Sequence, residues 1–153
     1  MFDLSDYLPY LMNRTMARLA AIGEIEFAKF GIKLQGWRVL ASLYAQDGQR
    51  ISELADSTSI EISTVSRLVD ALESQGFVEK RRERPRARSV TAHLTRQGRN
   101  LVQRLLPSAE YTERAAVEGI SAADLAVVKR ALKKMFDNLG RTEIEAKTGS
   151  KAG

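Results

Sequence analysis

The stretch that decides the fold is ISELADSTSIEISTVSRLVDALESQG, residues 51–76. Its first part predicts a brief helix that contains Leu54 and Ala55, with Ser52 as its N-cap, and the polar run 57–59 interrupts that helix. From residue 61 to residue 75 the apolar side chains recur in helical steps of three and four, at Val65, Leu68, Val69 and Leu72. Gly76 then suits the left-handed C-cap that ends a helix. A short helix, a tight polar turn and a longer helix with a polar outer face predict a helix-turn-helix.

The polar face of the longer helix carries the first set of candidate contacts. In helix-turn-helix proteins that bind DNA, the N-terminal residues of the second helix face base edges in the major groove. Small hydroxyl side chains allow a close approach, and arginine contacts guanine with two hydrogen bonds. We therefore predict DNA contacts from Ser63, Thr64, Ser66 and Arg67. The alternative is an ordinary solvated helix face.

A β-hairpin is predicted after Gly76, because the hydrophobic period there changes from 3.6 towards 2. One strand opens at residues 77–78 and the other spans residues 90–94. The segment 83–88 between them is nearly all charge and contains a proline, so it is a tip and not the interior of a strand. A hairpin in this position is the wing of a winged helix.

Positive charge is concentrated on this hairpin. Residues 78–99 hold eight Lys and Arg against two Glu, whereas the rest of the chain is nearly balanced. A basic patch on a neutral body is typical of a protein that binds a polyanion. We predict that Arg84, Arg86 and Arg88 contact DNA phosphates and the minor groove. The alternatives are a solvated loop and an acidic membrane surface, for which the apolar residues of the tip are poor anchors.

Helices are predicted on both sides of this region. A first helix ends near Gly31, and a second runs from about residue 34 to residue 46 with Trp37, Leu40, Ala41 and Leu43–Tyr44 inward. A further helix is capped by Thr95, and Pro107 is expected to kink or interrupt it. The last helix starts at Ser121 and carries a heptad-like seam, formed by Leu125, Val128, Leu132, Met135 and Leu139.

The predicted fold class is mainly α with a small β-hairpin wing (α+β). A winged helix-turn-helix lobe is expected at 34–103, a helical dimerisation region at 1–33 and 104–147, and a disordered tail at 148–153. The terminal apolar faces favour pairing with a second copy, and a closed monomeric bundle is the alternative.

Composition excludes several other classes of protein. The 153 residues fit one ordinary domain, and they contain no cysteine and a single histidine, His93. Disulfides, thiolate chemistry, two-histidine metal sites and catalytic pairs of histidines are thereby excluded. We find no phosphate-binding glycine loop and no nucleophile–base pair, so we predict no enzyme activity, no metal and no cofactor. No apolar stretch is long enough for a membrane span, and the acidic start does not resemble a signal peptide, so we expect a cytoplasmic protein without a membrane partner.

Several motifs together resemble one family. They are Leu34-Gln35-Gly36-Trp37-Arg38-Val39-Leu40, Ile51-Ser52-Glu53-Leu54-Ala55, the run from Ser63 to Val78, and Leu94-Thr95-Arg96-Gln97-Gly98. Their combination is similar to the core signature of the MarR family of winged-helix transcriptional regulators. The resemblance implies a homodimer in which each winged lobe binds half of a pseudo-palindromic operator on double-stranded DNA. It also implies a repressor that a small aromatic or lipophilic acid releases from DNA.

The wing departs from this family pattern. The family usually carries Asp-Arg-Arg before the last strand, and the corresponding positions here are Arg86, Ala87 and Arg88. The acidic residue that often orients a wing arginine is absent, so the sequence leaves open which arginine enters the minor groove.

An effector site is the remaining expectation. A pocket at the junction of the dimer helices and the winged lobe is well placed to change the spacing of the two recognition helices. Its candidate lining residues are Tyr7, Tyr10, Leu11, Arg14, Trp37 and Arg38. Aromatic walls with a guanidinium suit a small aromatic carboxylate, and the alternative is that these residues simply form core and interface.

For the whole chain, the alternative function is a helical interaction protein whose wing binds RNA or an acidic protein partner.

Overall fold

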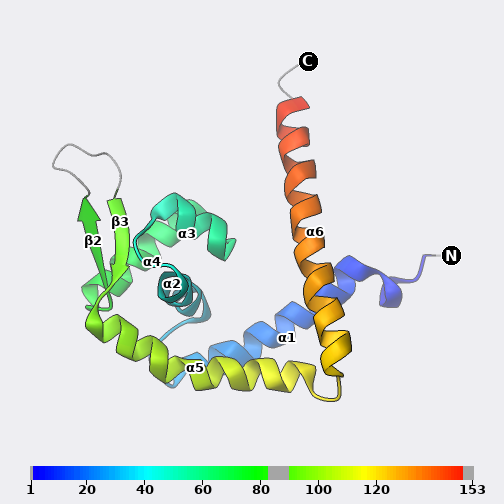
Figure 1. The fold of residues 1–153 in the computed structure, drawn as a ribbon, viewed down its shortest axis with the longest axis horizontal. Helices are drawn as coiled ribbons and strands as arrows, with labels where there is room; N and C mark the ends of the chain where they lie inside the picture. The colour runs from blue at the N-terminus through cyan, green and yellow to red at the C-terminus, as the bar shows by residue number, and fades with distance from the viewer. Residues whose placement is uncertain (1, 83–89, 150–153) are drawn as a thin grey trace. The chain divides into compact units, whose positions relative to one another are not determined.

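The computed structural model describes residues 2–82 and 90–149. The chain divides into two compact units, Met1–Glu113 and Arg114–Gly153. The elements in chain order are a 3-10 turn at Leu4–Asp6, α1 Leu8–Ala28, α2 Leu34–Ala45, β1 Gln49–Arg50, α3 Ile51–Thr58, α4 Ile62–Ser74, β2 Val78–Arg82, β3 Val90–Leu94, α5 Arg96–Val117 and α6 Ala122–Gly149 (Figure 1). The predicted fold class, mainly α with a small antiparallel sheet, is confirmed.

The predicted helix-turn-helix is formed by α3 and α4. Ser59 ends α3 in the left-handed conformation, with φ of 53°, and Ile60 turns its side chain into the core. Ser52 is not the N-cap of α3, because this helix begins at Ile51 directly after Arg50. Its first turn is closed by Glu53, whose carboxylate accepts a hydrogen bond of 2.7 Å from the backbone N–H of Arg50. Gly76, with φ of 77°, follows α4 as expected.

The hairpin belongs to a three-stranded antiparallel sheet in the order β1-β3-β2. β3 has the predicted bounds, and Val78 and Arg82 of β2 pair with Leu94 and Val90. The two-residue strand β1 was not predicted. It is fixed by the buried Gln49, whose amide donates hydrogen bonds of 2.9 Å and 2.7 Å to the carbonyls of Ser42 and Gln46.

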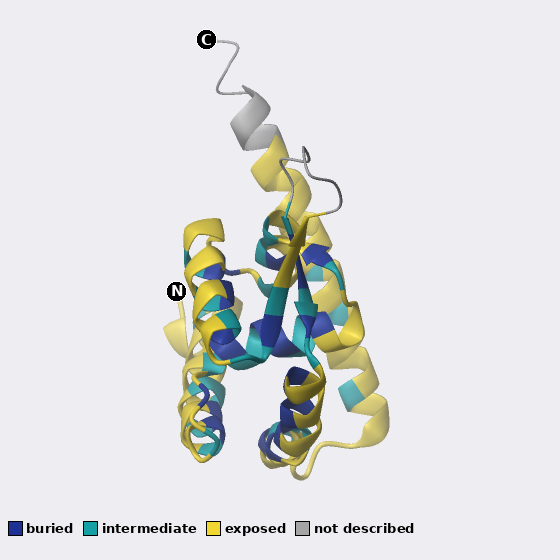
Figure 2. Cartoon of the chain, turned by 90° about the vertical axis from the view of Figure 1, so that its left-hand side faces the viewer, coloured by how far each residue is buried: buried dark blue, intermediate teal, exposed yellow. Residues whose placement is uncertain are grey.

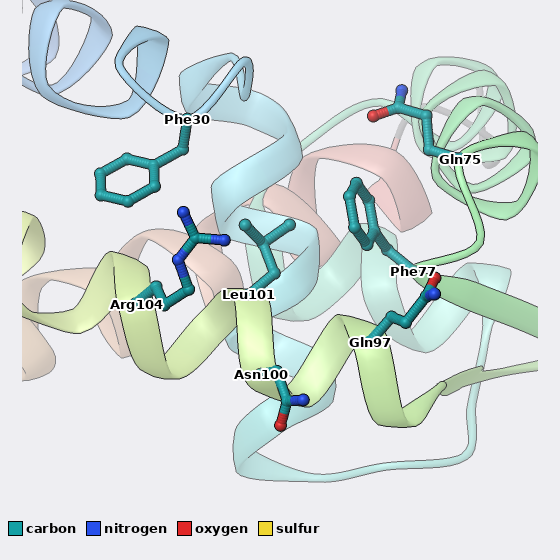
Figure 3. Close-up of a pocket in the computed structure, with 7 residues that line it drawn as sticks. All are labelled: Phe30, Gln75, Phe77, Gln97, Asn100, Leu101 and Arg104. Atoms are coloured by element: carbon teal, nitrogen blue, oxygen red, sulfur yellow. The ribbon is translucent and has the colours of Figure 1, made fainter.

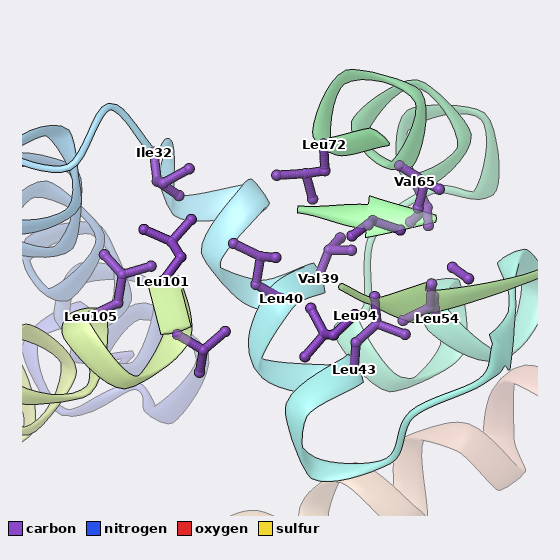
Figure 4. Packing of buried hydrophobic residues seen from close by; sticks show 14 of the residues in the cluster. Ile32, Val39, Leu40, Leu43, Leu54, Val65, Leu72, Leu94, Leu101 and Leu105 are labelled. Atoms are coloured by element: carbon purple, nitrogen blue, oxygen red, sulfur yellow. The ribbon is translucent and has the colours of Figure 1, made fainter. Parts of the chain in front are cut away.

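The hydrophobic core is organised around α2. Val39, Leu40 and Leu43 are fully buried on this helix, whereas Tyr44 is 38% exposed and does not point inward as expected. Figure 4 shows side chains of α3, α4, β3 and α5 converging on α2, and Figure 2 shows the buried positions on the inner faces of these elements. Burying a Leu or Val side chain stabilises the folded state by about 1.5–3 kcal/mol each, so this core holds the lobe together within a single chain.

The base of the hairpin is joined to α5 by a close backbone contact. The predicted cap is confirmed: the Thr95 hydroxyl accepts from the N–H of Gly98 at 3.0 Å and donates to the carbonyl of Gly76 at 2.6 Å. A Cβ on Gly98 would lie 2.0 Å from the carbonyl oxygen of Phe77, so only glycine fits here. The helix continues through Pro107, so the proline does not interrupt it.

The second unit is dominated by α6. The Ser121 hydroxyl accepts a hydrogen bond of 3.1 Å from the N–H of Asp124, which confirms the expected helix start. The predicted seam is largely exposed in the single chain, with Val128 at 45%, Leu132 at 43% and Leu139 at 67%. Figure 2 shows the same prevalence of exposed positions along the helix. α6 extends to Gly149, two residues into the expected tail, and residues 150–153 lie outside the described part of the chain.

Candidate nucleic-acid interface

The first turn of α4 brings three of the predicted contact residues together. Val65, Val69 and Leu72 anchor the inner face of the helix in the core, which leaves Ser63, Ser66 and Arg67 exposed and Thr64 half-buried. The Arg67 guanidinium folds back over this turn: its Nε donates to the Ser63 carbonyl at 3.3 Å, and its Nη2 lies 3.5 Å from the Thr64 hydroxyl. A basic side chain and two hydroxyls therefore share one small surface.

Glu61 belongs to the same surface, and sequence reasoning did not single it out. It is the N-cap of α4, and its carboxylate accepts hydrogen bonds from the Thr64 N–H at 3.1 Å and from the Ser63 hydroxyl. The Ser63 hydroxyl first, then backbone N–H groups and the charge of Arg67, hold the pKa of Glu61 below its ordinary value. The available signal was a carboxylate two residues before the first predicted contact residue, at a position where acidic caps are favoured.

The root of the wing is tied to α4 by charged side chains. The Lys80 ammonium lies 2.7 Å from an Asp70 carboxylate oxygen and 3.0 Å from one of Glu73, and the Lys80 N–H donates to Glu73 at 2.9 Å. Hydrogen bonds with Asp70 and then Glu73 raise the pKa of Lys80, and those from Lys80 lower the pKa of Glu73. These contacts hold the first residues of β2 against α4.

Arginines continue along β2 towards the tip. Arg81 is ion-paired with Glu79, and Arg82 is exposed at the end of the strand. The predicted wing contacts Arg84, Arg86 and Arg88 lie outside the residues that the structure describes.

His93 takes part in a structural junction below the wing. Asp47 accepts hydrogen bonds from the Leu94 N–H at 2.8 Å and from Arg99 at 2.7 Å, and its carboxylate lies 3.8 Å from the His93 ring. The other ring nitrogen of His93 lies 3.0 Å from the Thr91 hydroxyl. These contacts join the loop after α2 to β3 and α5.

The expected effector residues form two separate groups of contacts. On α1, the Arg14 guanidinium lies 5.5 Å from the centre of the Tyr10 ring. Tyr7 and Leu11 are exposed, at 46% and 40%. On α2, Trp37 stacks on Phe27 with ring centres 5.0 Å apart and packs against the core, beside the half-buried Arg38.

A pocket of about 490 Å³ is lined by a different set of residues, Phe30, Gln75, Phe77, Gln97, Asn100, Leu101 and Arg104 (Figure 3). The Arg104 guanidinium lies 5.5 Å from the centre of the Phe30 ring, and Figure 3 shows Leu101 and Phe77 between this pair and Gln75. The lining comes from the turn after α1, the loop between α4 and β2, and the first half of α5. Segments so far apart in sequence share no local pattern, which is why the sequence did not indicate this pocket.

No helix within 2–82 and 90–149 has the length and apolar character needed to cross a membrane. In the same part of the chain, no three His, Cys, Asp or Glu side chains are grouped as metal ligands.

A helix-turn-helix with an exposed polar first turn on its second helix, followed by an antiparallel strand pair, defines a winged helix-turn-helix protein. A model of the MarR family matches residues 32–90. The crystal structure of a MarR-family transcriptional regulator from Silicibacter pomeroyi is 34% identical, with 89% of this chain and 92% of that chain covered and a TM-score of 0.81. The chain therefore belongs to the MarR family, whose members are transcriptional regulators.

Two further relatives are informative. The HTH-type transcriptional repressor Mb2911 of Mycobacterium bovis is 30% identical over 133 residues, which cover 87% of this chain and 93% of that protein. A MarR-family regulator from Listeria monocytogenes, solved in complex with a 26mer DNA, shares the fold with a TM-score of 0.85. It is 23% identical, with 97% of each chain covered.

Proposed function

We propose that this protein is a repressor that binds a pseudo-palindromic operator on double-stranded DNA as a homodimer in the cytoplasm, without catalytic activity. The observation that carries the proposal is the first turn of α4, where hydrogen bonds join Arg67 to Ser63 and Thr64 on a helix whose opposite face is anchored in the core. The repressor among the relatives and the DNA complex of the Listeria protein support it. Binding of RNA or of an acidic protein partner is not favoured by these comparisons.

The experiment that tests DNA recognition is a gel shift on the DNA upstream of the protein's own gene, with random duplex as competitor. Arg67→Ala should weaken operator binding by about 1–3 kcal/mol and leave random-duplex binding nearly unchanged, because a base contact is lost. The triple variant Arg84→Ala, Arg86→Ala, Arg88→Ala should instead weaken binding to both. It should reduce the slope of log K against log salt by about 0.9 for each lost phosphate contact. Equal binding of operator and competitor by the wild type would contradict the proposal.

The dimer part of the proposal rests on apolar side chains that the single chain leaves exposed. They occur at both ends of the chain, at Leu4, Leu8 and Leu11 and at Val128, Leu132 and Leu139. Regions 1–33 and 104–147 would supply the interface, and region 34–103 the DNA-binding lobe. Two identical lobes would match the two half-sites of a palindromic operator.

The effector part concerns a small aromatic or lipophilic acid. The first candidate site is formed by Tyr7, Tyr10, Leu11, Arg14, Trp37 and Arg38, in which Tyr10 and Arg14 are in contact. The pocket beside Arg104 and Phe30 offers the same combination of a guanidinium and aromatic rings, so it is the second candidate. Benzoate and a panel of substituted aromatic acids should release the protein from its operator and change Trp37 fluorescence. Loss of the response in Arg14→Ala assigns the first site, and loss in Arg104→Ala assigns the second.

A further inference from the structure

We infer that Glu61 is a specificity-determining residue of the DNA interface, which selects cytosine in the major groove and disfavours DNA that lacks it at that position. The inference rests on the proposed DNA recognition and adds a residue to it. Glu61 lies directly before α4, it is exposed, and it is bonded to the side chain of Ser63 and the backbone of Thr64.

The hydrogen bonds of Glu61 leave part of the carboxylate available to DNA. The bonds from the Ser63 hydroxyl and the Thr64 N–H both end on Oε2. An ionised carboxylate accepts about four hydrogen bonds over its two oxygens and donates none. The Ser63 hydroxyl and the backbone N–H groups of Ser63 and Thr64 use most of this capacity and orient the side chain, and the remainder is available to a donor on DNA.

The same bonds change what Ser63 offers. A serine hydroxyl has one proton, and here that proton is donated to Glu61. The outer lone pairs of Ser63 then act as acceptors, so Glu61 and Ser63 together present acceptors to the groove. Arg67 supplies the complementary donors beside them, and its position is set by the Ser63 carbonyl and the Thr64 hydroxyl.

Among the base edges of the major groove, an acceptor surface of this kind fits cytosine best. Cytosine presents the N4 amino donor, and its guanine partner presents the O6 and N7 acceptors that suit arginine. Adenine also has an amino donor, but its N7 acceptor lies next to it and would repel a carboxylate. Phosphates repel the carboxylate as well, so Glu61 lowers the affinity of any complex in which its charge is not matched by a base donor.

The test is in vitro selection from a pool of random-sequence duplexes with wild type, Glu61→Gln and Glu61→Ala, followed by sequencing of the bound DNA. We expect one cytosine position in the wild-type site that moves towards adenine with Glu61→Gln, since glutamine pairs with adenine, and loses its preference with Glu61→Ala. On the selected site, the ratio of affinities for cytosine and for the best other base should fall about 5- to 150-fold in the Glu61 variants, the usual range for one base position.

A matched control is Asp56→Asn, which makes the same change of charge on α3 at another exposed position. It should alter overall affinity through charge alone and leave the cytosine preference intact. Circular dichroism establishes that each variant is folded. If wild type enriches a site and both Glu61 variants enrich the same one with unchanged preference, the inference about Glu61 is overturned while DNA recognition stands. If wild type enriches nothing, the proposed function itself fails.

Discussion

The amphipathic helices α4 and α6 differ in where their apolar stripes find cover. On α4, Val65 and Val69 are 0% exposed and Leu72 is 4% exposed, because α2, α3 and the sheet surround them. On α6, Val128, Leu132 and Leu139 are between 43% and 67% exposed. The repeat of apolar residues is equally regular in both helices, so the pattern alone does not tell which helix is covered within its own chain.

The difference indicates how the two parts are stabilised. The lobe that contains α4 has its own core, whereas apolar side chains of α6 stay exposed in the single chain, and these are the side chains that the proposed dimer would cover. Substitutions on α4 and the base of the wing should therefore destabilise the lobe more than matched substitutions on α6.

Gly98→Ala should have the largest effect. Its new Cβ would lie 2.0 Å from the Phe77 carbonyl oxygen, and that oxygen also accepts a hydrogen bond of 3.1 Å from the Thr95 N–H. Relief of the clash separates α5 from the base of the wing, so we expect a loss of about 3 kcal/mol or more in the free energy of unfolding. Gly140→Ala is the matched change on α6, where no atom lies within 4 Å of the new Cβ. It should gain about 0.5–1 kcal/mol through helix propensity. If urea unfolding gave the same change in the free energy of unfolding for Gly98→Ala and Gly140→Ala, the predicted difference between the lobe and α6 would be wrong.

Leu72→Ala should follow, with a loss of about 2–5 kcal/mol, because a nearly buried side chain on α4 leaves a cavity. Its melting temperature should fall by the same amount at every protein concentration, since the lost contacts lie within one chain. The control Leu139→Ala removes a side chain of α6 that is 67% exposed in the single chain. Its fall in melting temperature relative to wild type should change with protein concentration. A concentration-independent fall as large as that of Leu72→Ala would contradict the proposed role of α6.

Glu73→Gln should have a smaller, pH-dependent effect on the link between α4 and β2. The pKa of Glu73 is lowered from 4.5, so its stabilising contribution is present above about that pH and is lost as pH falls through the folded-state value. The pKa of Lys80 is raised from 10.5, so its contribution is lost only as pH rises through its folded-state value. Solvent still reaches both side chains, which are 34% exposed for Lys80 and 37% exposed for Glu73, and it screens the pair, so we expect less than about 1 kcal/mol at pH 7. Urea unfolding at pH 7 and pH 3 measures the difference in the free energy of unfolding between wild type and Glu73→Gln. This difference should be smaller at pH 3. An equal difference at both pH values would mean that Glu73 stabilises the protein through packing and not through its charge.

The sequence predicted the elements whose signals are local. The apolar repeat of α4, the bounds of β3 and the caps Thr95 and Ser121 all agree with the structure, because each depends on residues within one or two turns. β1 was missed because its two residues are fixed by the side chain of Gln49 and by pairing with β3, more than forty residues away. The pocket beside Arg104 was missed for the same reason. The sequence could have indicated Glu61 as the N-cap of α4, but the role inferred for it depends on the orientation of the Ser63 hydroxyl, which the sequence does not show.

Leu132→Asp should have the smallest effect on the lobe and the clearest effect on assembly. Leu132 is 43% exposed on α6 and belongs to the second unit, so a carboxylate there remains hydrated in the single chain and the lobe keeps its core. In a dimer the same carboxylate would be buried without a partner, which is costly. Sedimentation at micromolar concentration should therefore give a folded monomer of about 17 kDa, while wild type sediments as a dimer. Operator binding should weaken, because one lobe contacts only one half-site.

Lys133→Asp, at the neighbouring exposed position, introduces the same carboxylate outside the stripe and should leave the dimer intact. A wild-type monomer, or a Leu132→Asp dimer of unchanged stability, would show that the stripe of α6 is not covered by a second copy.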